Sequence, residues 1–147
     1  MIMYKHILIP TDGSPLSEEA VRQGMALAKS LGAKTTVITV SPKFHTLAVE
    51  PGMVIATPKE YERECEAVAA KVLGTAEGVA SESNVAFRAL HVVHDHPYAA
   101  IIEAAQTNHC DLICMASHGR KGLSALILGS ETTKVLTHSK IPVLVCR

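Results

Sequence analysis

The residues best suited to chemistry lie in a basic loop that contains two glycines and is followed by a Gly-Ser pair. The loop runs in the order Ala116, Ser117, His118, Gly119, Arg120, Lys121, Gly122. Nine residues separate Gly119 from Gly129, and Ser130 follows directly. Glycines let a ligand approach the backbone N–H groups closely, and Arg120 and Lys121 add positive charge. This combination is typical of a site that binds an anion such as phosphate.

The elements on either side of this loop are predicted to direct further donors at the same place. Leu112 to Ala116 has the length and apolarity of a strand buried on both faces, and it leads directly into the loop. Ser130 is expected to be the N-cap of a helix whose first N–H groups point back toward the loop. Three or four charge-assisted hydrogen bonds of about 1.5–3 kcal/mol each could hold a polyphosphate. The alternative is an ordinary glycine-containing surface loop.

The composition restricts any anion site to a local one. The chain has 147 residues, which predicts a single domain, residues 1–147, with a core of its own. Lys plus Arg and Asp plus Glu both total 14, and aromatic residues are scarce, so neither a nucleic-acid-binding surface nor a base-stacking platform is indicated. No segment approaches the ~20 apolar residues that span a bilayer. We therefore expect a cytoplasmic protein without nucleic-acid or membrane partners.

The four cysteines show neither metal-binding nor disulfide-type spacing. Cys114 and Cys146 fall in apolar strand-like runs, and Cys65 falls on an apolar helical stripe. Buried free thiols are therefore expected at these three positions. Cys110 comes just before a strand and is expected to be the most accessible of the four.

Strands and helices are predicted to alternate along the whole chain. Helix starts are indicated by Ser14 with Pro15, by a capping box from Thr57 to Glu60, and by His96 with Pro97. The expected strands are 6–9, 35–40, 85–93, 112–116 and 142–146, and the expected helices begin at 15, 58, 97 and about 130. This alternation predicts an α/β fold with a single doubly wound, five-stranded parallel sheet and helices on both faces. The long connection 41–56 has no predicted role.

In such a sheet, ligands bind beyond the carboxyl ends of the strands, where the strand order reverses. For the order 3-2-1-4-5, the reversal lies between the first and fourth strands. The turns at that place are 11–14 (TDGS) and 116–122, which are the two most polar glycine-containing turns in the chain. This coincidence favours the phosphate site over the surface loop.

Three blocks of sequence, in this order and at these separations, resemble the universal stress protein family. They are 6–14 (HILIPTDGS), 111–119 (DLICMASHG), and Gly129-Ser130 through 142–145 (PVLV), so the resemblance covers nearly the whole chain. It implies an adenine nucleotide alpha hydrolase-like fold and a homodimer, in a family that divides into members that bind ATP and members that do not. The ATP-binding pattern of the family maps onto Ala116, Gly119, Gly129 and Ser130, with alanine at a position where glycine is usual. We expect ATP binding to tolerate Ala116 if its backbone is strand-like, but not if φ is positive.

The same resemblance implies a role for individual residues. Asp12 would bond the ribose or adenine side, with a turn that bonds its own backbone as the alternative. Val40 would meet the adenine through its backbone. Gly119, Gly129 and Ser130 would hold the phosphates together with Mg²⁺ or Mn²⁺, for which no protein ligands are predicted. The full predicted nucleotide-binding set is Pro10, Thr11, Asp12, Val40, Ala116, Ser117, His118, Gly119, Arg120, Gly122, Gly129, Ser130 and Glu131.

Two other groups of reactive side chains are not predicted to be active sites. The cluster of His91, His94, Asp95 and His96 matches no zinc spacing, so a solvated turn is expected. The family commonly has glycine at the position of Asp95, and an acid there would either repel phosphate or help to hold a metal. The adjacent Ser117 and His118 should point apart on an extended backbone. No catalytic residue is predicted, and any ATP hydrolysis would be slow.

The last strand predicts a contact between two copies of the chain. Val143, Leu144 and Val145 form an apolar edge, and an unpaired edge invites strand addition, so a homodimer through this strand is expected. The leading hypothesis is a nucleotide-dependent regulator or adaptor of the stress response, with an unknown downstream protein partner. The alternatives are a dimer that binds no nucleotide and acts only through protein contacts, and a slow ATP hydrolase or phosphotransfer enzyme.

Overall fold

Five parallel strands alternate with helices in the computed structural model, which describes residues 3–44, 57–119 and 128–147. The sheet order is β3-β2-β1-β4-β5, so the α/β class and the strand order predicted from the sequence are confirmed. In chain order the elements are β1 (His6–Pro10), α1 (Pro15–Leu31), β2 (Lys34–Ser41), α2 (Pro58–Ser83), β3 (Phe87–Val93), α3 (Pro97–Thr107), β4 (Leu112–Ala116), α4 (Ser130–His138) and β5 (Val143–Cys146).

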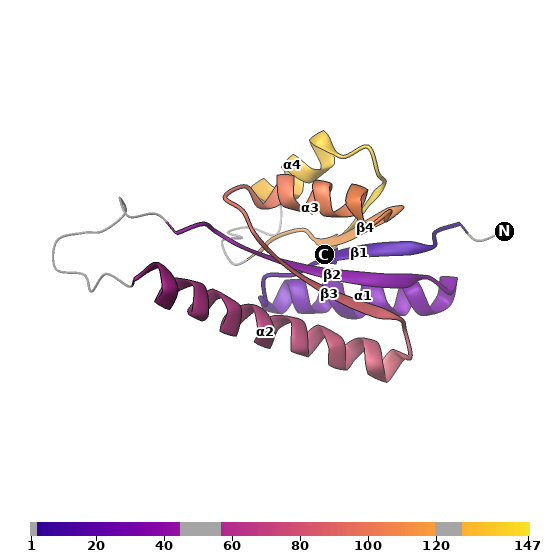
Figure 1. The fold of residues 1–147 in the computed structure, drawn as a ribbon. Helices are drawn as coiled ribbons and strands as arrows, with labels where there is room; N and C mark the ends of the chain where they lie inside the picture. Colours follow the sequence, from indigo (N-terminus) through magenta and orange to yellow (C-terminus); the bar gives the residue numbers. More distant parts are fainter. Residues whose placement is uncertain (1–2, 45–56, 120–127) are drawn as a thin grey trace.

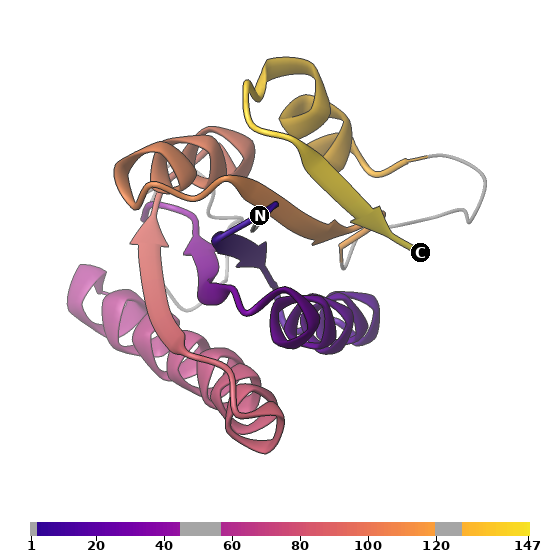
Figure 2. The same ribbon diagram turned by 90° about the vertical axis from the view of Figure 1, so that its right-hand side faces the viewer.

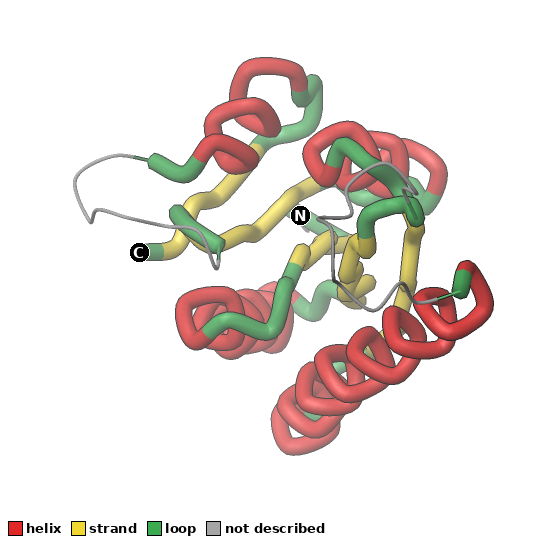
Figure 3. Tube along the Cα trace, turned by 90° about the vertical axis from the view of Figure 1, so that its left-hand side faces the viewer, coloured by secondary structure: helices red, strands yellow, loops and turns green. Residues whose placement is uncertain are grey.

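Helices cover both faces of the sheet (Figure 1), and the strands lie between the two helical layers (Figure 3). The central strand β1 is buried throughout, with Ile7 and Ile9 in the core under α1 and α2, and Leu8 in the core under α3 and α4. Strands β3 and β5 lie at opposite edges (Figure 2). No helix in the described part of the chain is long and apolar enough to cross a membrane.

The predicted helix starts of α1 and α2 are confirmed at the level of individual bonds. The Ser14 hydroxyl accepts the backbone N–H of Ser17 at 3.3 Å. Thr57 and Glu60 form both bonds of a capping box, at 3.2 Å and 2.9 Å. These caps satisfy N–H groups that have no partner inside the helix. Local sequence therefore fixes where both helices begin.

Several predicted boundaries are wrong by one or two residues, including those of β1, which extends to Pro10, and of β2, which runs from Lys34 to Ser41. The N-cap of α4 is Gly129, and Ser130 is the first helical residue. β3 begins at Phe87 instead of Val85, because the Val85 N–H bonds the Ala80 carbonyl and completes the end of α2. β5 begins at Val143 instead of residue 142, which is a proline and has no N–H for the ladder.

The accessibility of two cysteines also differs from the prediction. Cys110 is buried, because it follows His109 in the left-handed region (φ 55°) and turns into the core under α3. Burial, with a smaller effect of Asp111, raises the pKa of the Cys110 thiol to about 11. Cys65 is only partly buried, because buried positions of α2 begin at Ala69. In Figure 1 the start of α2 extends past the sheet.

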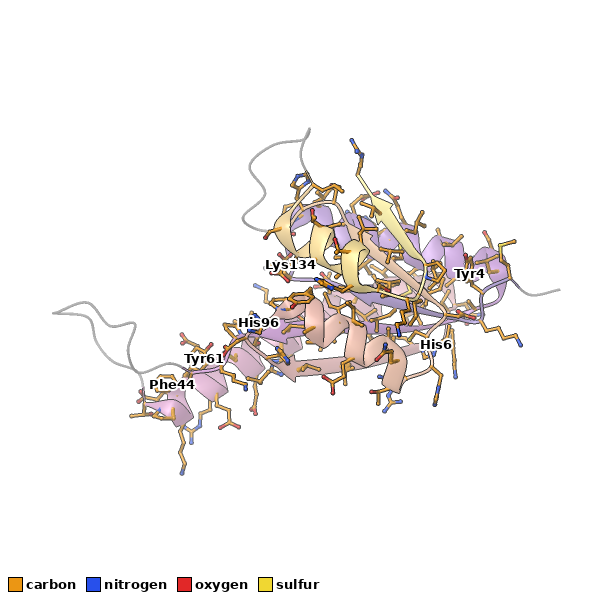
Figure 4. All side chains as sticks on the ribbon, turned by 90° about the horizontal axis from the view of Figure 1, so that it is seen from above. Tyr4, His6, Phe44, Tyr61, His96 and Lys134 are labelled. Carbon is orange, nitrogen blue, oxygen red and sulfur yellow. The ribbon has the colours of Figure 1, made fainter. Side chains whose placement is uncertain are left out.

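Ring-containing side chains lie at both ends of the molecule. Phe44 and Tyr61 pack with ring centroids 5.4 Å apart at the start of α2, and Tyr4 and His6 lie at the opposite end (Figure 4). The Tyr61 hydroxyl donates to the Pro42 carbonyl at 2.7 Å, and burial raises its pKa to about 12. Tyr61 thereby anchors the end of α2 to the chain that follows β2.

The buried histidine His6 is expected to make stability depend on pH. Its Nε2 is 2.7 Å from Thr36 Oγ1, and its buried Nδ1 has no hydrogen-bond partner among the described residues. Burial, followed by the charge of Lys34, lowers the pKa of His6, against smaller opposing effects of the Asn108 backbone and of Asp111. The unfolded chain therefore binds a proton more readily, and stability is lost as pH falls from about 6.5 toward the lower folded pKa.

We expect the free energy of unfolding of the parent protein to fall more than that of His6→Gln when the pH is lowered from 7.5 to 5.5. Glutamine keeps a polar atom near Thr36 but does not titrate. Urea denaturation at both pH values measures the difference. A difference that stays constant across this interval would show that His6 contributes no pH dependence.

Two glycines are expected to respond to alanine in opposite directions. A Cβ on Gly74 of α2 would meet no described atom within 4 Å, whereas a Cβ on Gly24 of α1 would lie 2.6 Å from Ile9 Cδ1. Gly74→Ala should raise the free energy of unfolding by about 1 kcal/mol through helix propensity. Gly24→Ala should lower it by about 1–3 kcal/mol through overpacking of the core. Denaturant titration measures both changes, and equal effects at the two positions would contradict the packing described here.

Candidate functional site

The carboxyl ends of β1 and β4 meet at the predicted reversal of strand order, and two glycines bring the segments there into contact. A Cβ on Gly119 would lie only 2.6 Å from Asp12 Oδ2. The N–H of Gly129 donates to the Ser117 carbonyl at 2.8 Å, and a Cβ on Gly129 would lie 3.1 Å from that oxygen. The turn after β1, the turn after β4 and the start of α4 therefore converge, and only a residue without a side chain fits easily at either glycine.

Asp12 is fixed by its own turn. Its Oδ1 accepts the Ser14 N–H at 2.9 Å and the Ser17 hydroxyl at 2.8 Å, while Gly13 takes a φ of 80°. The local turn that was considered as an alternative is therefore present. It holds the carboxylate in place and leaves Oδ2 on the side of Gly119. An aspartate fixed in this way can accept hydrogen bonds from ligand hydroxyls without first losing side-chain freedom.

Ala116 has a backbone that places no strain on alanine. It is the last residue of β4 and pairs with Cys146 of β5. Among the described residues, the only ones other than glycine with positive φ are Asn84 and His109. The Ala116 carbonyl also accepts the Thr132 hydroxyl at 2.9 Å, which joins β4 to α4. The condition under which Ala116 would disturb the site, a positive φ, is therefore not met.

The expectation that Ser117 and His118 point apart is wrong. Ser117 Oγ lies 2.9 Å from Nδ1 of His118. The prediction assumed an extended backbone, but β4 ends at Ala116 and the chain bends at Ser117, so the alternation of side chains stops there. Ser117 is only 4% exposed, so its hydroxyl orients the His118 ring and is not open to a substrate.

The start of α4 also differs from the prediction in its capping. Ser130 is in the first turn, and no side chain caps this helix end. The first bond inside the helix is from the Thr133 N–H to the Gly129 carbonyl at 3.0 Å. The N–H groups of residues 130–132 therefore have no partner within the helix, and the residue before them, Gly129, lies beside Ser117 and His118. Such a helix end favours an anion.

Glu131 is bonded to a different helix. Its Oε2 accepts the Tyr98 N–H at 2.8 Å, and its Oε1 is 3.7 Å from Lys134 Nζ. His96, the N-cap of α3, makes no capping bond with its side chain, so the Glu131 carboxylate serves the start of α3 instead. Only the backbone of Glu131 remains for the predicted site. The sequence carries no local signal for this bond, because its partners are 33 positions apart.

The other predicted residues divide into those placed at the same edge and those outside the described residues. Pro10 ends β1, and Thr11 follows it with its N–H bonded to the Ile38 carbonyl at 2.9 Å. Val40 is near the end of β2, half-buried and paired with Val92 of β3. Arg120 and Gly122, with Lys121 between them and most of the connection 41–56, lie outside the described residues.

The histidine cluster after β3 is held by ordinary hydrogen bonds. His91 Nε2 lies 2.8 Å from the Ser41 hydroxyl, and His94 Nδ1 accepts the His96 N–H at 2.9 Å. Asp95 Oδ1 accepts the Lys43 N–H at 3.0 Å, so this carboxylate joins the turn to the chain after β2. Within the described ranges, no group of three or more His, Cys, Asp or Glu side chains is placed to hold a metal ion.

These features define a doubly wound α/β protein whose polar, glycine-containing turns meet at its topological switch point. The chain belongs to the universal stress protein family, whose model matches residues 3–147. It is 32% identical over 148 residues to universal stress protein MJ0531 of Methanocaldococcus jannaschii, an alignment that covers 99% of this chain and 83% of the relative. The resemblance stated from the sequence is thus confirmed at the level of the family.

Solved structures agree with the fold. Protein MJ0577, also of M. jannaschii, aligns with a TM-score of 0.75 and 27% identity over 98% of this chain and 96% of its own. A universal stress protein in complex with cAMP and one from Archaeoglobus fulgidus in complex with dAMP both align with a TM-score of 0.68. Their identities are 23% and 17%, and coverage is 97% or more of each chain. Each of these two proteins is thus solved with an adenine nucleotide bound.

Proposed function

We propose that this protein is a cytoplasmic homodimer that binds ATP at the junction of β1, β4 and α4 and acts as a nucleotide-dependent regulator or adaptor in the stress response. The observation that carries the proposal is the close approach of Gly119 to Asp12, where a Cβ would lie 2.6 Å from a carboxylate oxygen. Two polar turns that meet through a glycine leave room for a ligand to contact the backbone of one and the carboxylate of the other.

Each part of ATP has a chemically suitable partner. The fixed Asp12 carboxylate would accept from the ribose hydroxyls, and the Val40 backbone at the end of β2 would meet the adenine. Gly119, Gly129 and the first N–H groups of α4 would hold the phosphates, because an uncapped helix start favours negative charge. The cAMP and dAMP complexes of relatives support an adenine nucleotide as the ligand class.

A divalent cation fits this site as a companion of the nucleotide. No group of three His, Cys, Asp or Glu side chains in the described residues could hold the ion alone. Mg²⁺ typically binds through substrate phosphates, water and one or two protein oxygens. The Ser130 hydroxyl, in the first turn of α4, would be one such protein oxygen. When bound, the ion would neutralise part of the phosphate charge.

Binding, with at most slow hydrolysis, is supported better than catalysis. The Ser117 and His118 contact is the one observation that favours a phosphotransfer enzyme, but the serine hydroxyl is buried against the histidine. The other alternative, a dimer that binds no nucleotide, depended on strain at Ala116, and that residue lies in a regular strand. Calorimetric titration with ATP and magnesium, followed by an assay for free phosphate, separates these functions. The proposed function gives saturable heat and at most slow phosphate release, a hydrolase releases phosphate over many turnovers, and a dimer that binds no nucleotide gives no heat.

A further inference from the structure

Two buried thiols face each other across the last pair of strands. Cys114 of β4 and Cys146 of β5 have their Sγ atoms 3.5 Å apart. In the parallel register Cys114 is opposite Leu144 and Ala116 is opposite Cys146, so the two thiols are diagonal neighbours on one face of the sheet. Both side chains belong to the core under α1, and both are free cysteines. Neither takes part in the candidate nucleotide site.

We propose that Cys114 and Cys146 are an oxidisable pair, a modification site at which a hydroperoxide converts two thiols into one disulfide. A disulfide needs its sulfur atoms about 2.05 Å apart. The present contact must therefore shorten, which rotation of two side chains and a small shift of the edge strand can supply. The two other cysteines, Cys65 and Cys110, lie on α2 and just before β4, so they do not share this arrangement.

The position of Cys146 decides where oxidation starts. Cys146 is 5% exposed and is the last residue of a four-residue strand, whereas Cys114 is fully buried in the middle of β4, which has neighbours on both sides. The end of a short strand opens at lower free energy than the middle of a central one, whether or not a second copy pairs with β5. Burial, and next the neighbouring Cys146, raises the pKa of Cys114 above its usual range, which also favours first attack by Cys146.

The chemistry balances in two steps. The Cys146 sulfur attacks the peroxide O–O bond, which releases an alcohol, or water from hydrogen peroxide, and leaves a sulfenic acid. The Cys114 sulfur then attacks the sulfenic sulfur, and its proton leaves with the departing hydroxyl as water. Two thiols and one hydroperoxide thus give one disulfide, one alcohol and one water, and the peroxide takes up both electrons.

A disulfide between Cys114 and Cys146 would lie close to the candidate nucleotide site. The Cys146 carbonyl accepts the Ser117 N–H at 2.8 Å, so the end of β5 holds the first residue of the turn after β4. The covalent loop would enclose 115–145, which includes Gly119 and Gly129. Closing a loop of this length is expected to raise the melting temperature by roughly 5–10 °C. The modification site itself does not depend on nucleotide binding.

The test uses the full chain with Cys65→Ser and Cys110→Ala, which leaves only the proposed pair. The reduced protein is treated with hydrogen peroxide, unfolded in N-ethylmaleimide and analysed by intact mass and peptide mapping. We expect a loss of two hydrogen atoms (about 2 Da), no alkylation, one peptide that joins both cysteines, and the rise in melting temperature. A matched protein that also carries Cys146→Ala should show none of these changes.

Three results would overturn the proposal. Full alkylation of both thiols after peroxide treatment would mean that they are only packed core residues. Sulfinic acid on Cys146 without a disulfide would mean that Cys114 cannot resolve the first product. A disulfide found only between two chains would assign the reactivity to an intermolecular contact. If the intramolecular disulfide between Cys114 and Cys146 forms, reduction with a phosphine should restore the mass of the reduced protein.

Discussion

Replacing Gly119 with valine is expected to abolish ATP binding while the protein stays folded. The first carbon of any side chain at this position would lie 2.6 Å from Asp12 Oδ2. The valine must displace the carboxylate proposed to hold the ribose, and its methyl groups would occupy the space proposed for the phosphates. We expect an affinity loss of at least ~100-fold, equivalent to about 2.7 kcal/mol. Calorimetric titration with ATP and magnesium measures the effect.

Retention of the fold follows from the surroundings of Gly119. It is exposed, and its φ is not positive, so valine meets no backbone strain there. Displacing the Asp12 carboxylate weakens its bonds to Ser14 and Ser17 and is expected to cost about 1–3 kcal/mol, less than the roughly 5–15 kcal/mol by which a domain of this kind is stable. The matched control is Gly78→Val on α2, where an added Cβ meets no described atom within 4 Å. Normal ATP binding by a folded Gly119→Val protein would show that the phosphates lie elsewhere.

Replacing Leu144 with lysine is expected to convert the proposed dimer into monomers. β5 is at the edge of the sheet, and Leu144 is 44% exposed. In a two-fold symmetric contact through this edge, each substitution occurs twice and the two lysines would lie near each other. Charged residues on an edge strand are the usual protection against strand addition. Sedimentation velocity at micromolar concentration should show the mass of a dimer for the parent and of a monomer for the variant.

The control for this prediction is an equally exposed leucine away from the edge. Leu136 on α4 is 42% exposed, so Leu136→Lys adds the same charge on a surface that lies outside the proposed dimer contact. It should sediment as the parent does. A dimer that survives Leu144→Lys, or a parent that is monomeric at micromolar concentration, would remove β5 as the interface.

Much of the fold could be predicted because its signals are local. Ser14 and Thr57 cap their helices through bonds within three residues, and each is followed by proline. The apolar run of β4 indicated a strand buried on both faces, and all of its residues are buried. The meeting of Asp12 and Gly119 followed from the strand order, because the ends of β1 and β4 are neighbours in the sheet.

The errors arose where a bond joins distant parts of the chain or where an element ends. Glu131 reads as an ordinary first-turn acid, but its carboxylate bonds Tyr98 of α3. Gly129 displaced Ser130 from the cap, because its N–H bonds the Ser117 carbonyl across the loop. The contact of Ser117 with His118 depends on a bend one residue after the strand. None of these has a signal in sequence spacing.

The most direct test of ATP binding is a calorimetric titration of the purified protein with ATP in the presence of magnesium. We predict saturable heat for one nucleotide per chain, a melting temperature that rises with ATP concentration, and loss of both effects in Gly119→Val. At roughly millimolar ATP, even a weak nucleotide site with a Kd of about 1 mM is half filled. The absence of both heat and a thermal shift at this concentration would contradict the proposal that the protein binds ATP.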